Sequence, residues 1–241
     1  MKNNDKNDFI STVSHELRTP LTSIRGFAQT MLASWDKLDE SDKKKFIKII
    51  EEQSNRLINL IENMLSVTKL QSDKNDFILK EVSVKPVIET VVSIVKNQYP
   101  NHEFEIKILE NTPRILVDSD KFYQIMTNLI ENAAKYSNPH TTITIETGFC
   151  EKCDYLPVSV TDKGIGINEK DFDRIFEKFS RIDNPLTRKI QGSGLGLFIT
   201  KNLVEKMDGQ IFVISKDGQT TFKVLLPVAN IEKQARVKCN Q

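Results

Sequence analysis

Two apolar stripes in adjoining segments constrain the fold of this chain more than any other feature. Apolar side chains recur at spacings of three and four over residues 9–31 and again over residues 46–67. This period of about 3.5 residues predicts two long amphipathic helices within residues 8–70. Asp39 or Ser41, in the polar turn between them, is a suitable N-cap for the second helix.

A single hairpin of this kind cannot cover both of its apolar stripes by itself. Two copies packed as a four-helix bundle can cover them, so we expect a homodimer. The alternative is a monomer in which the hairpin folds back on the rest of the chain.

A hydroxylated and charged segment of the first predicted helix contains His15, one of the chain's three histidines. Its neighbours Glu16, Arg18 and Thr19 suggest no packing role for this imidazole. Pro20 removes a backbone hydrogen bond and is expected to bend the helix, so that His15 and Thr19 face solvent. An imidazole that solvent can reach is a candidate acceptor for a phosphoryl group.

The charge balance, with 34 basic and 33 acidic side chains in 241 residues, gives no electrostatic reason to expect nucleic acid or a membrane surface as a partner. No apolar run approaches the roughly 20 residues that cross a bilayer, and the polar start is unlike a signal peptide. We therefore expect a cytoplasmic location, with membrane attachment only through a sensor region outside this sequence. Cys150 and Cys153 form a CxxC that lacks further metal ligands, and we interpret it as an incidental loop pair.

Beyond a polar linker near residues 71–76, predicted helices and strands come in separate blocks, which favours an α+β two-layer sandwich. The chain is thus expected to be multi-domain, with an all-α helical hairpin at residues 1–72, the sandwich at 73–230 and a tail at 231–241. Helices are predicted at residues 84–98, 119–136, 171–179 and 195–207, and strands at 77–82, 103–109, 115–117, 142–149, 156–161, 210–215 and 220–226.

The predicted helix that ends near Ser137 carries Asn128, Glu131, Asn132 and Lys135 on one face. Amide oxygens are hard ligands for Mg²⁺, and an ammonium can meet phosphate as a point charge. Taken alone, the segment fits a magnesium-phosphate site and a solvated helix face equally well.

A first glycine cluster, DKGIGI at residues 162–167, comes directly after a predicted strand. Asp162 could accept a hydrogen bond from an exocyclic amine. Gly164 and Gly166 would let the backbone turn tightly and approach a flat base.

A second cluster, GSGLGL at residues 192–197, opens a predicted helix, where free backbone amides can bind an anion. No βαβ unit surrounds it, so it lacks the context of a dinucleotide fingerprint. The segment between the clusters predicts a mobile lid or, alternatively, an ordinary basic loop. Its aromatic and cationic residues are Phe176, Lys178, Phe179, Arg181, Arg188 and Lys189.

The order of these motifs resembles the sensor histidine kinases of two-component systems. An H-box (SHELRTPL), an N-box (NLIENAAKYS), a G1 box (DKGIGI), an F-box (FEKF) and a G2 box (GSGLGL) follow one another as they do in that family, over residues 9–227. The resemblance implies a dimerisation and phosphoacceptor hairpin followed by a Bergerat-type ATP-binding domain.

The resemblance also implies catalytic roles for three residues of the H-box. His15 would be phosphorylated, Glu16 would be the adjacent base, and Thr19 would orient the water of the reverse, phosphatase reaction. The implied function is ATP-dependent autophosphorylation followed by transfer to an aspartate of a response regulator receiver domain, with phospho-regulator phosphatase activity.

In the implied ATP site, Asn132 would bind Mg²⁺, Asn128 and Lys135 would support the phosphates, and Asp162 would read the adenine amino group. The chain departs from the family at Gln219, where a glycine is usual. The remaining implied ATP-binding residues are Tyr136, Gly164, Gly166, Ile167, Phe179, Arg181, Gly192, Gly194, Leu195, Gly196, Leu197 and Thr220.

Three other interpretations are compatible with parts of the sequence. The phosphatase reaction could dominate, or the chain could be a nucleotide-gated scaffold without phosphotransfer. An ATPase clamp of the gyrase or chaperone type could use Glu131 to activate water, but it would leave the hairpin with His15 unexplained.

Overall fold

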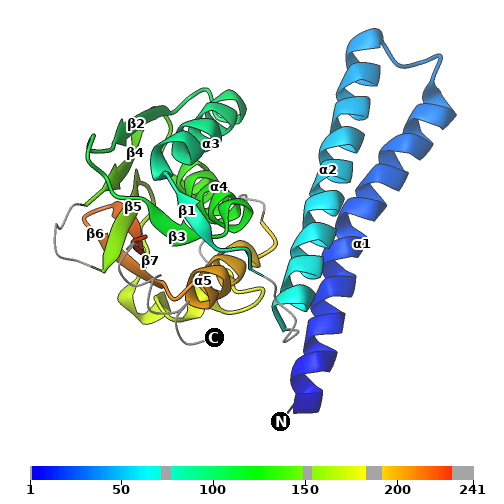
Figure 1. Cartoon of the computed structure of the whole chain (residues 1–241). Coiled ribbons are helices and arrows are strands. Elements are labelled where there is room, and N and C mark those ends of the chain that lie inside the picture. Colours follow the sequence, from blue (N-terminus) through cyan, green and yellow to red (C-terminus); the bar gives the residue numbers. More distant parts are fainter. Residues whose placement is uncertain (1, 72–76, 149–153, 183–191, 230–241) are drawn as a thin grey trace. The chain divides into compact units, whose positions relative to one another are not determined.

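The computed structural model describes residues 2–71, 77–148, 154–182 and 192–229, with side chains from residue 11 onward. The chain forms two compact units, Met1–Gln71 and Ser72–Gln241, a helical hairpin and a mixed α/β body (Figure 1). The CxxC, the predicted tail and two cations of the predicted lid, Arg188 and Lys189, lie outside the described residues. None of the helices in the described part of the chain combines the length and apolar character needed to cross a membrane.

The first unit consists of two long helices, α1 (Lys2–Ser34) and α2 (Glu40–Gln71). The backbone N–H of Asp42 donates to Oδ1 of Asp39 at 2.7 Å. This bond satisfies one of the free donors in the first turn of α2. The prediction of two helices is confirmed, with Asp39 rather than Ser41 as the cap. α1 runs through Pro20 without interruption, and the Pro20 side chain is buried.

The hairpin buries only part of its apolar surface. Between the helices, the rings of Phe27 and Phe46 lie 5.2 Å apart. A stripe on the outside of the hairpin unit remains about half exposed, and its members are Leu21, Ile58, Ile61 and Leu65, with exposed fractions of 47% to 56%. An apolar surface of this kind costs free energy in water as long as nothing covers it.

The second unit is built on a five-stranded mixed sheet in the order β2-β4-β5-β7-β6. β2 and β4 pair in parallel, and the other neighbours are antiparallel. Two short strands, β1 (Lys80–Val82) and β3 (Ile115–Val117), form a separate antiparallel pair. The strands of the large sheet are β2 (Glu103–Lys107), β4 (Thr142–Thr147), β5 (Tyr155–Lys163), β6 (Gln210–Lys216) and β7 (Gln219–Pro227).

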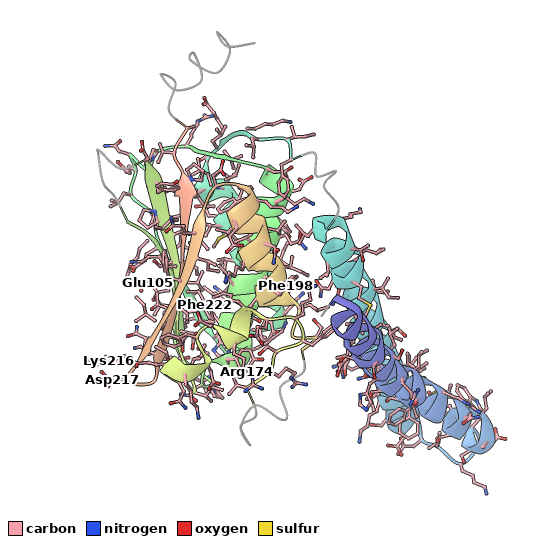
Figure 2. The ribbon with its side chains drawn as sticks, turned by 90° about the horizontal axis from the view of Figure 1, so that it is seen from below. Glu105, Arg174, Phe198, Lys216, Asp217 and Phe222 are labelled. Atoms are coloured by element: carbon pink, nitrogen blue, oxygen red, sulfur yellow. The ribbon has the colours of Figure 1, made fainter. Side chains whose placement is uncertain are left out.

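Three helices, α3 (Val84–Gln98), α4 (Ser119–Tyr136) and α5 (Gly196–Lys206), cover one face of this sheet (Figures 1 and 2). The core lies between the two layers. Its fully buried members include Phe122, Met126, Leu129, Ile130, Ile145, Val158, Ile199 and Val224. The predicted two-layer α+β sandwich is therefore confirmed.

The prediction of a helix at residues 171–179 is wrong. The structure has two short 3-10 turns there, η1 (Glu169–Asp171) and η2 (Arg174–Phe176), and extended backbone at Glu177. Apolar side chains of this segment, among them the buried Ile175 and Phe176, anchor it on the core. A segment this short gains too little from helix formation to offset the cost of nucleation.

The register of the sheet places three polar residues in one row. Asp162 on β5 lies opposite Thr220 on β7, which lies opposite Ser215 on β6. Directly opposed residues of antiparallel strands share a face of the sheet. Asp162 and Thr220 are buried. They lie two residues from Val160 and Phe222 on the same strands, and side chains two apart on a strand point to the same face. The row therefore lies on the face that the helices cover.

Asp118 is predicted to be a major local stabiliser of the second unit. Its Oδ1 accepts from the N–H groups of Asp120 and Lys121 at 3.0 and 3.2 Å, and its Oδ2 accepts from Ile78 N–H at 3.1 Å. We expect Asp118→Ala to lower the free energy of unfolding by about 2 kcal/mol in urea denaturation, because it removes a helix cap. Asp120→Ala removes the same charge from the same turn and is expected to cost only about 0.5 kcal/mol through the helix dipole. Equal losses in the two variants would contradict the capping role.

Candidate functional site

The three candidate catalytic residues of the first unit lie within about one turn of α1. His15 and Thr19 are exposed, and the Thr19 hydroxyl donates to the backbone carbonyl of His15 at 3.3 Å. Glu16 follows His15 by about 100° around the helix and points to α2, where its Oε2 lies 3.5 Å from a guanidinium nitrogen of Arg56. Solvent can therefore reach the imidazole, while the neighbouring carboxylate is held by an ion pair that sequence reasoning missed.

Asp162 is the most unusual ionisable group of the second unit. Its side chain is only 4% exposed, and burial raises its pKa from the ordinary value to about 7. Within the described part of the chain, no hydrogen bond satisfies its carboxylate. A carboxylate that is largely buried and has no protein donor has lost much of its hydration, and a ligand that donates to it would offset this cost.

The loop that follows Asp162 is pressed against the C-terminal end of α4. The N–H of Asn138 donates to the carbonyl of Lys163 at 2.9 Å, and a Cβ at Gly164 would collide with the carbonyl oxygen of Tyr136. Gly166 has a φ of +71°, which side chains rarely allow. The two glycines of the first cluster are thus required by the backbone, and they leave the space beside Asp162 free of side chains.

The second cluster lies against the F-box. A Cβ at Gly194 would lie 2.7 Å from the carbonyl carbon of Phe179, and both residues have positive φ, +66° and +58°. The residues that flank the undescribed segment 183–191 are therefore in backbone contact. Whether this segment acts as the predicted lid stays a prediction, and Arg181, at its edge, is exposed.

An aromatic side chain anchors the F-box on the core. Phe176 is buried and meets Phe222 edge-on, with ring centroids 6.4 Å apart. Lys201 of α5 lies 5.5 Å from the Phe176 ring, and Lys178 lies 5.1 Å from the ring of Phe198. Figure 2 shows Phe222 on the helix-covered side of the sheet. These contacts tie the F-box to α5, the helix that the second glycine cluster opens.

Asn128, on the polar face of α4, connects this helix to α5. Its amide nitrogen donates to the carbonyl of Gly196 and to the hydroxyl of Thr200, both at 3.3 Å. Its role toward phosphate stays a prediction, since the contacts present are structural. At the start of α5, Leu195 is fully buried, Leu197 is half-buried and the N–H of Leu195 donates to Oγ of Ser193 at 3.3 Å.

Lys135 and Glu131 form an ion pair on α4, with 2.8 Å between Nζ and Oε2. Burial lowers the pKa of Lys135, but the charge and hydrogen bond of Glu131 more than offset this effect and raise it above the ordinary value. The ammonium is therefore charged but already compensated. Glu131 is also the residue that an ATPase clamp would use as its base, and here its carboxylate is engaged by Lys135.

Asn132 is half-buried, and among the described residues its side chain has no hydrogen-bond partner. The described residues contain no cluster of three or more His, Cys, Asp or Glu side chains that could hold a metal ion. Mg²⁺ is commonly bound by one or two protein oxygens together with phosphate oxygens. A single free amide oxygen at Asn132 fits that requirement, so the residues present are compatible with a magnesium nucleotide.

Ser215 joins this site and was missed by sequence reasoning. Its hydroxyl accepts from the N–H of Ile167 at 2.8 Å and lies 3.2 Å from the hydroxyl of Thr220. Thr220 itself is 3% exposed, and Gln219, the departure from the family pattern, is exposed on the same strand. The only signal in the sequence is one hydroxyl in an otherwise apolar strand, two residues before an Asp-Gly turn.

Two family models match this chain. Residues 5–73 match the His Kinase A (phospho-acceptor) domain, and residues 117–230 match the histidine kinase-, DNA gyrase B- and HSP90-like ATPase. The first range contains His15, and the second contains the row of Asp162, Thr220 and Ser215.

Two curated relatives are similar along almost the whole chain. The sensor histidine kinase WalK of Bacillus subtilis is 31% identical over 226 residues, which cover 92% of this chain and 37% of WalK. The histidine-protein kinase ArlS of Staphylococcus epidermidis is 32% identical over 228 residues, which cover 94% of this chain and 49% of ArlS. The chain spans half the length or less of both relatives.

Among solved structures, the histidine kinase ThkA in complex with the response regulator protein TrrA has a TM-score of 0.71 at 22% identity, covering 92% of this chain and 61% of that chain. This likeness shows a shared fold. The identification made from the order of the motifs is confirmed by the family models and relatives together. The chain belongs to the sensor histidine kinases of two-component systems and contains domains that match the phosphoacceptor and ATPase models of that family.

Proposed function

We propose that this chain uses ATP to phosphorylate His15 and passes the phosphoryl group to an aspartate of a response regulator. One observation carries the proposal: a buried carboxylate, Asp162, which has no donor among the described residues, is followed by a glycine loop in the same chain as an exposed imidazole flanked by an ion-paired glutamate. The first arrangement fits an adenine nucleotide, and the second fits a phosphoacceptor.

The chemistry asks the protein mainly for positioning and charge stabilisation. A ring nitrogen of His15 attacks the γ-phosphorus of ATP, the bond to the β–γ bridging oxygen breaks, and ADP leaves. The imidazole gains positive charge as the N–P bond forms. Glu16 is suited to offset this charge and to accept the proton of the other ring nitrogen.

In the nucleotide site, Asp162 would accept a hydrogen bond from the exocyclic amine of adenine. Asn132 would hold Mg²⁺, which when bound would neutralise phosphate charge. The ammonium of Lys135 could contact phosphate only while it remains paired with Glu131, which would weaken its attraction for the phosphate. The N–H groups at the start of α5 would face the phosphates as the positive end of a helix dipole.

We infer that the partner is a response regulator receiver domain, whose aspartate oxygen would attack the phosphorus and release the imidazole. The solved complex of ThkA with TrrA supports a partner of this class by analogy of fold. The exposed Thr19 hydroxyl, one turn from His15, is suited to orient a water molecule, so we include phospho-regulator phosphatase activity in the proposal.

We also infer that the hairpin functions as a homodimer. The supporting observation is the uncovered stripe of Leu21, Ile58, Ile61 and Leu65. A second hairpin with the same stripe can bury it through knobs-into-holes packing, which a four-helix bundle provides.

Autophosphorylation is tested with γ-labelled ATP and Mg²⁺. We expect acid-labile, alkali-stable label on the intact chain and none on His15→Gln or Asp162→Asn, because one variant lacks the acceptor and the other the adenine contact. His140→Asn removes another exposed imidazole and keeps the label. Nucleotide binding without label on the intact chain would contradict the kinase proposal and favour the scaffold or the phosphatase-dominant interpretation.

The pH dependence of ADP affinity tests Asp162. A carboxyl whose pKa lies near 7 is mostly protonated at pH 6 and accepts poorly from an amine. Affinity should therefore rise about tenfold between pH 6 and pH 8, after which it levels off.

The raised pKa of Asp162 also affects the stability of the ligand-free unit, and this effect has the opposite sign. The ligand-free unit loses stability as pH rises from about 4 to 7, where the unfolded chain ionises Asp162 and the folded chain does not.

The control for this measurement is Asp162→Asn, which is neutral at every pH used. Its ADP affinity should be weaker and should change only through the nucleotide's own titration. The ratio of the two dissociation constants isolates Asp162. A ratio that stays constant from pH 6 to pH 8 would contradict the role proposed for this carboxylate.

The dimer is tested by placing a charge on the uncovered stripe. Ile61→Glu should convert the chain from dimer to monomer in light scattering coupled to size exclusion, because burying the new carboxylate in the bundle is costly. Asn59→Glu adds the same charge to an exposed position on the other flank of α2 and should leave the dimer intact. A wild-type chain that is monomeric at micromolar concentration would refute the dimer.

A further inference from the structure

We propose that Ser215 is a positioning residue for nucleotide binding, because its hydroxyl joins the glycine loop after β5 to the β6–β7 hairpin. This inference rests on the ATP-binding role proposed above and adds to it a residue outside the family motifs. Ser215 is bonded to Ile167 and Thr220, two of the implied ATP-binding residues, so its effect on a nucleotide is exerted through the groups that it holds.

Three hydrogen-bonding groups meet at the Ser215 hydroxyl. The N–H of Ile167 donates to it at 2.8 Å, although 48 positions separate the two residues. The carbonyl of Gln219 lies at 3.3 Å and the hydroxyl of Thr220 at 3.2 Å. A serine hydroxyl has one hydrogen and two acceptor sites. It can thus accept from Ile167 and Thr220 while it donates to Gln219, which satisfies all three groups.

The start of this loop is held by α4 through the bridge between Gly164 and Ser137, and Ile167 is held by the Ser215 hydroxyl. β5 ends at Lys163 and the next regular element begins at Glu169. Gly166, just before Ile167, has a positive φ, and a Cβ there would lie 3.4 Å from the Ser215 hydroxyl. Removing the hydroxyl would leave the N–H of Ile167 without its partner and free the glycine loop to move.

The hairpin that carries Ser215 is a firm support. β6 and β7 are joined by a two-residue turn in which Asp217 and Gly218 both have positive φ, +53° and +73°. This is the pattern of a type I′ turn, whose twist matches that of the paired strands. Figure 2 shows Lys216 and Asp217 at the tip of the hairpin. The hydrogen bond from Ile167 to this hydroxyl therefore attaches the glycine loop to a tight hairpin and restrains its motion.

Ser215 also acts on the row that contains the unpartnered carboxylate. Thr220 stands between Asp162 and Ser215 in the register of the three strands. The bond between the two hydroxyls fixes the side chain of Thr220 next to the strand position of Asp162. One atom thus holds both the loop that follows Asp162 and the buried residue opposite it.

The test compares Ser215→Ala, Ser215→Thr and a control, Ser159→Ala. Ser159 is buried on β5 and faces the opposite side of the sheet. We expect Ser215→Ala to weaken ADP binding about tenfold, the scale of losing one buried hydrogen bond. Amide hydrogen exchange at residues 164–168 should become faster. KM for ATP should rise with binding, while kcat at saturating ATP should stay within about twofold of wild type.

Each comparison has a defined outcome. Ser215→Thr keeps a hydroxyl and should restore affinity to within about threefold of wild type. Unchanged ADP affinity in Ser215→Ala, or an equal loss in Ser159→Ala, would overturn the inference, as would a Ser215→Ala chain that is unfolded by circular dichroism. If wild type binds ADP and labels His15, such a result overturns the role of Ser215 alone. A wild-type chain that binds no ADP overturns this inference and the proposed function together.

Discussion

The nucleotide site proposed for this protein depends on a buried carboxylate that has no hydrogen-bond donor among the described residues. Asp162 lies on the helix-covered face of the sheet, where burial raises its pKa to about 7. Holding it there opposes folding, because the ionised form loses its hydration. The surrounding structure has to offset this cost with a dense core of α4, α5 and the central strands. A domain optimised for stability alone would place an apolar residue here, so the carboxylate marks the site at which a ligand is expected.

α4 serves the core and the site at the same time. Its apolar face supplies Phe122, Met126 and Leu129 to the interior, and its polar face points the other way. On that face Asn128 is bonded to α5 and Lys135 to Glu131, and the amide of Asn132 has no partner among the residues that the structure describes. The two neighbours therefore keep the helices in place and set the local charge, while the free amide is the group available to a metal.

The hairpin unit solves a different problem. A phosphoacceptor has to be reached from solution, and His15, the proposed acceptor, is exposed, while the neighbouring Glu16 is paired with Arg56 of α2. The same exposure extends to a stripe of apolar side chains, which two helices cannot cover. The accessibility of the proposed acceptor and the second hairpin that we propose thus have one origin, the small interior of a two-helix unit.

Local patterns in the sequence determined most of the elements. Residues 119–136 form a helix and residues 142–147 a strand because hydrophobic period and capping act over a few residues, and the glycines at 164 and 166 were identified for the backbone freedom that they do provide. The prediction of a helix at 171–179 was wrong, because the apolar side chains of this segment anchor two short turns on the core, as Phe176 does against Phe222. The partners of Glu16 and Ser215 were decided only by the tertiary structure. Each bond joins residues some 40 to 50 positions apart, and such pairs depend on helix pairing and strand register, which no local pattern encodes.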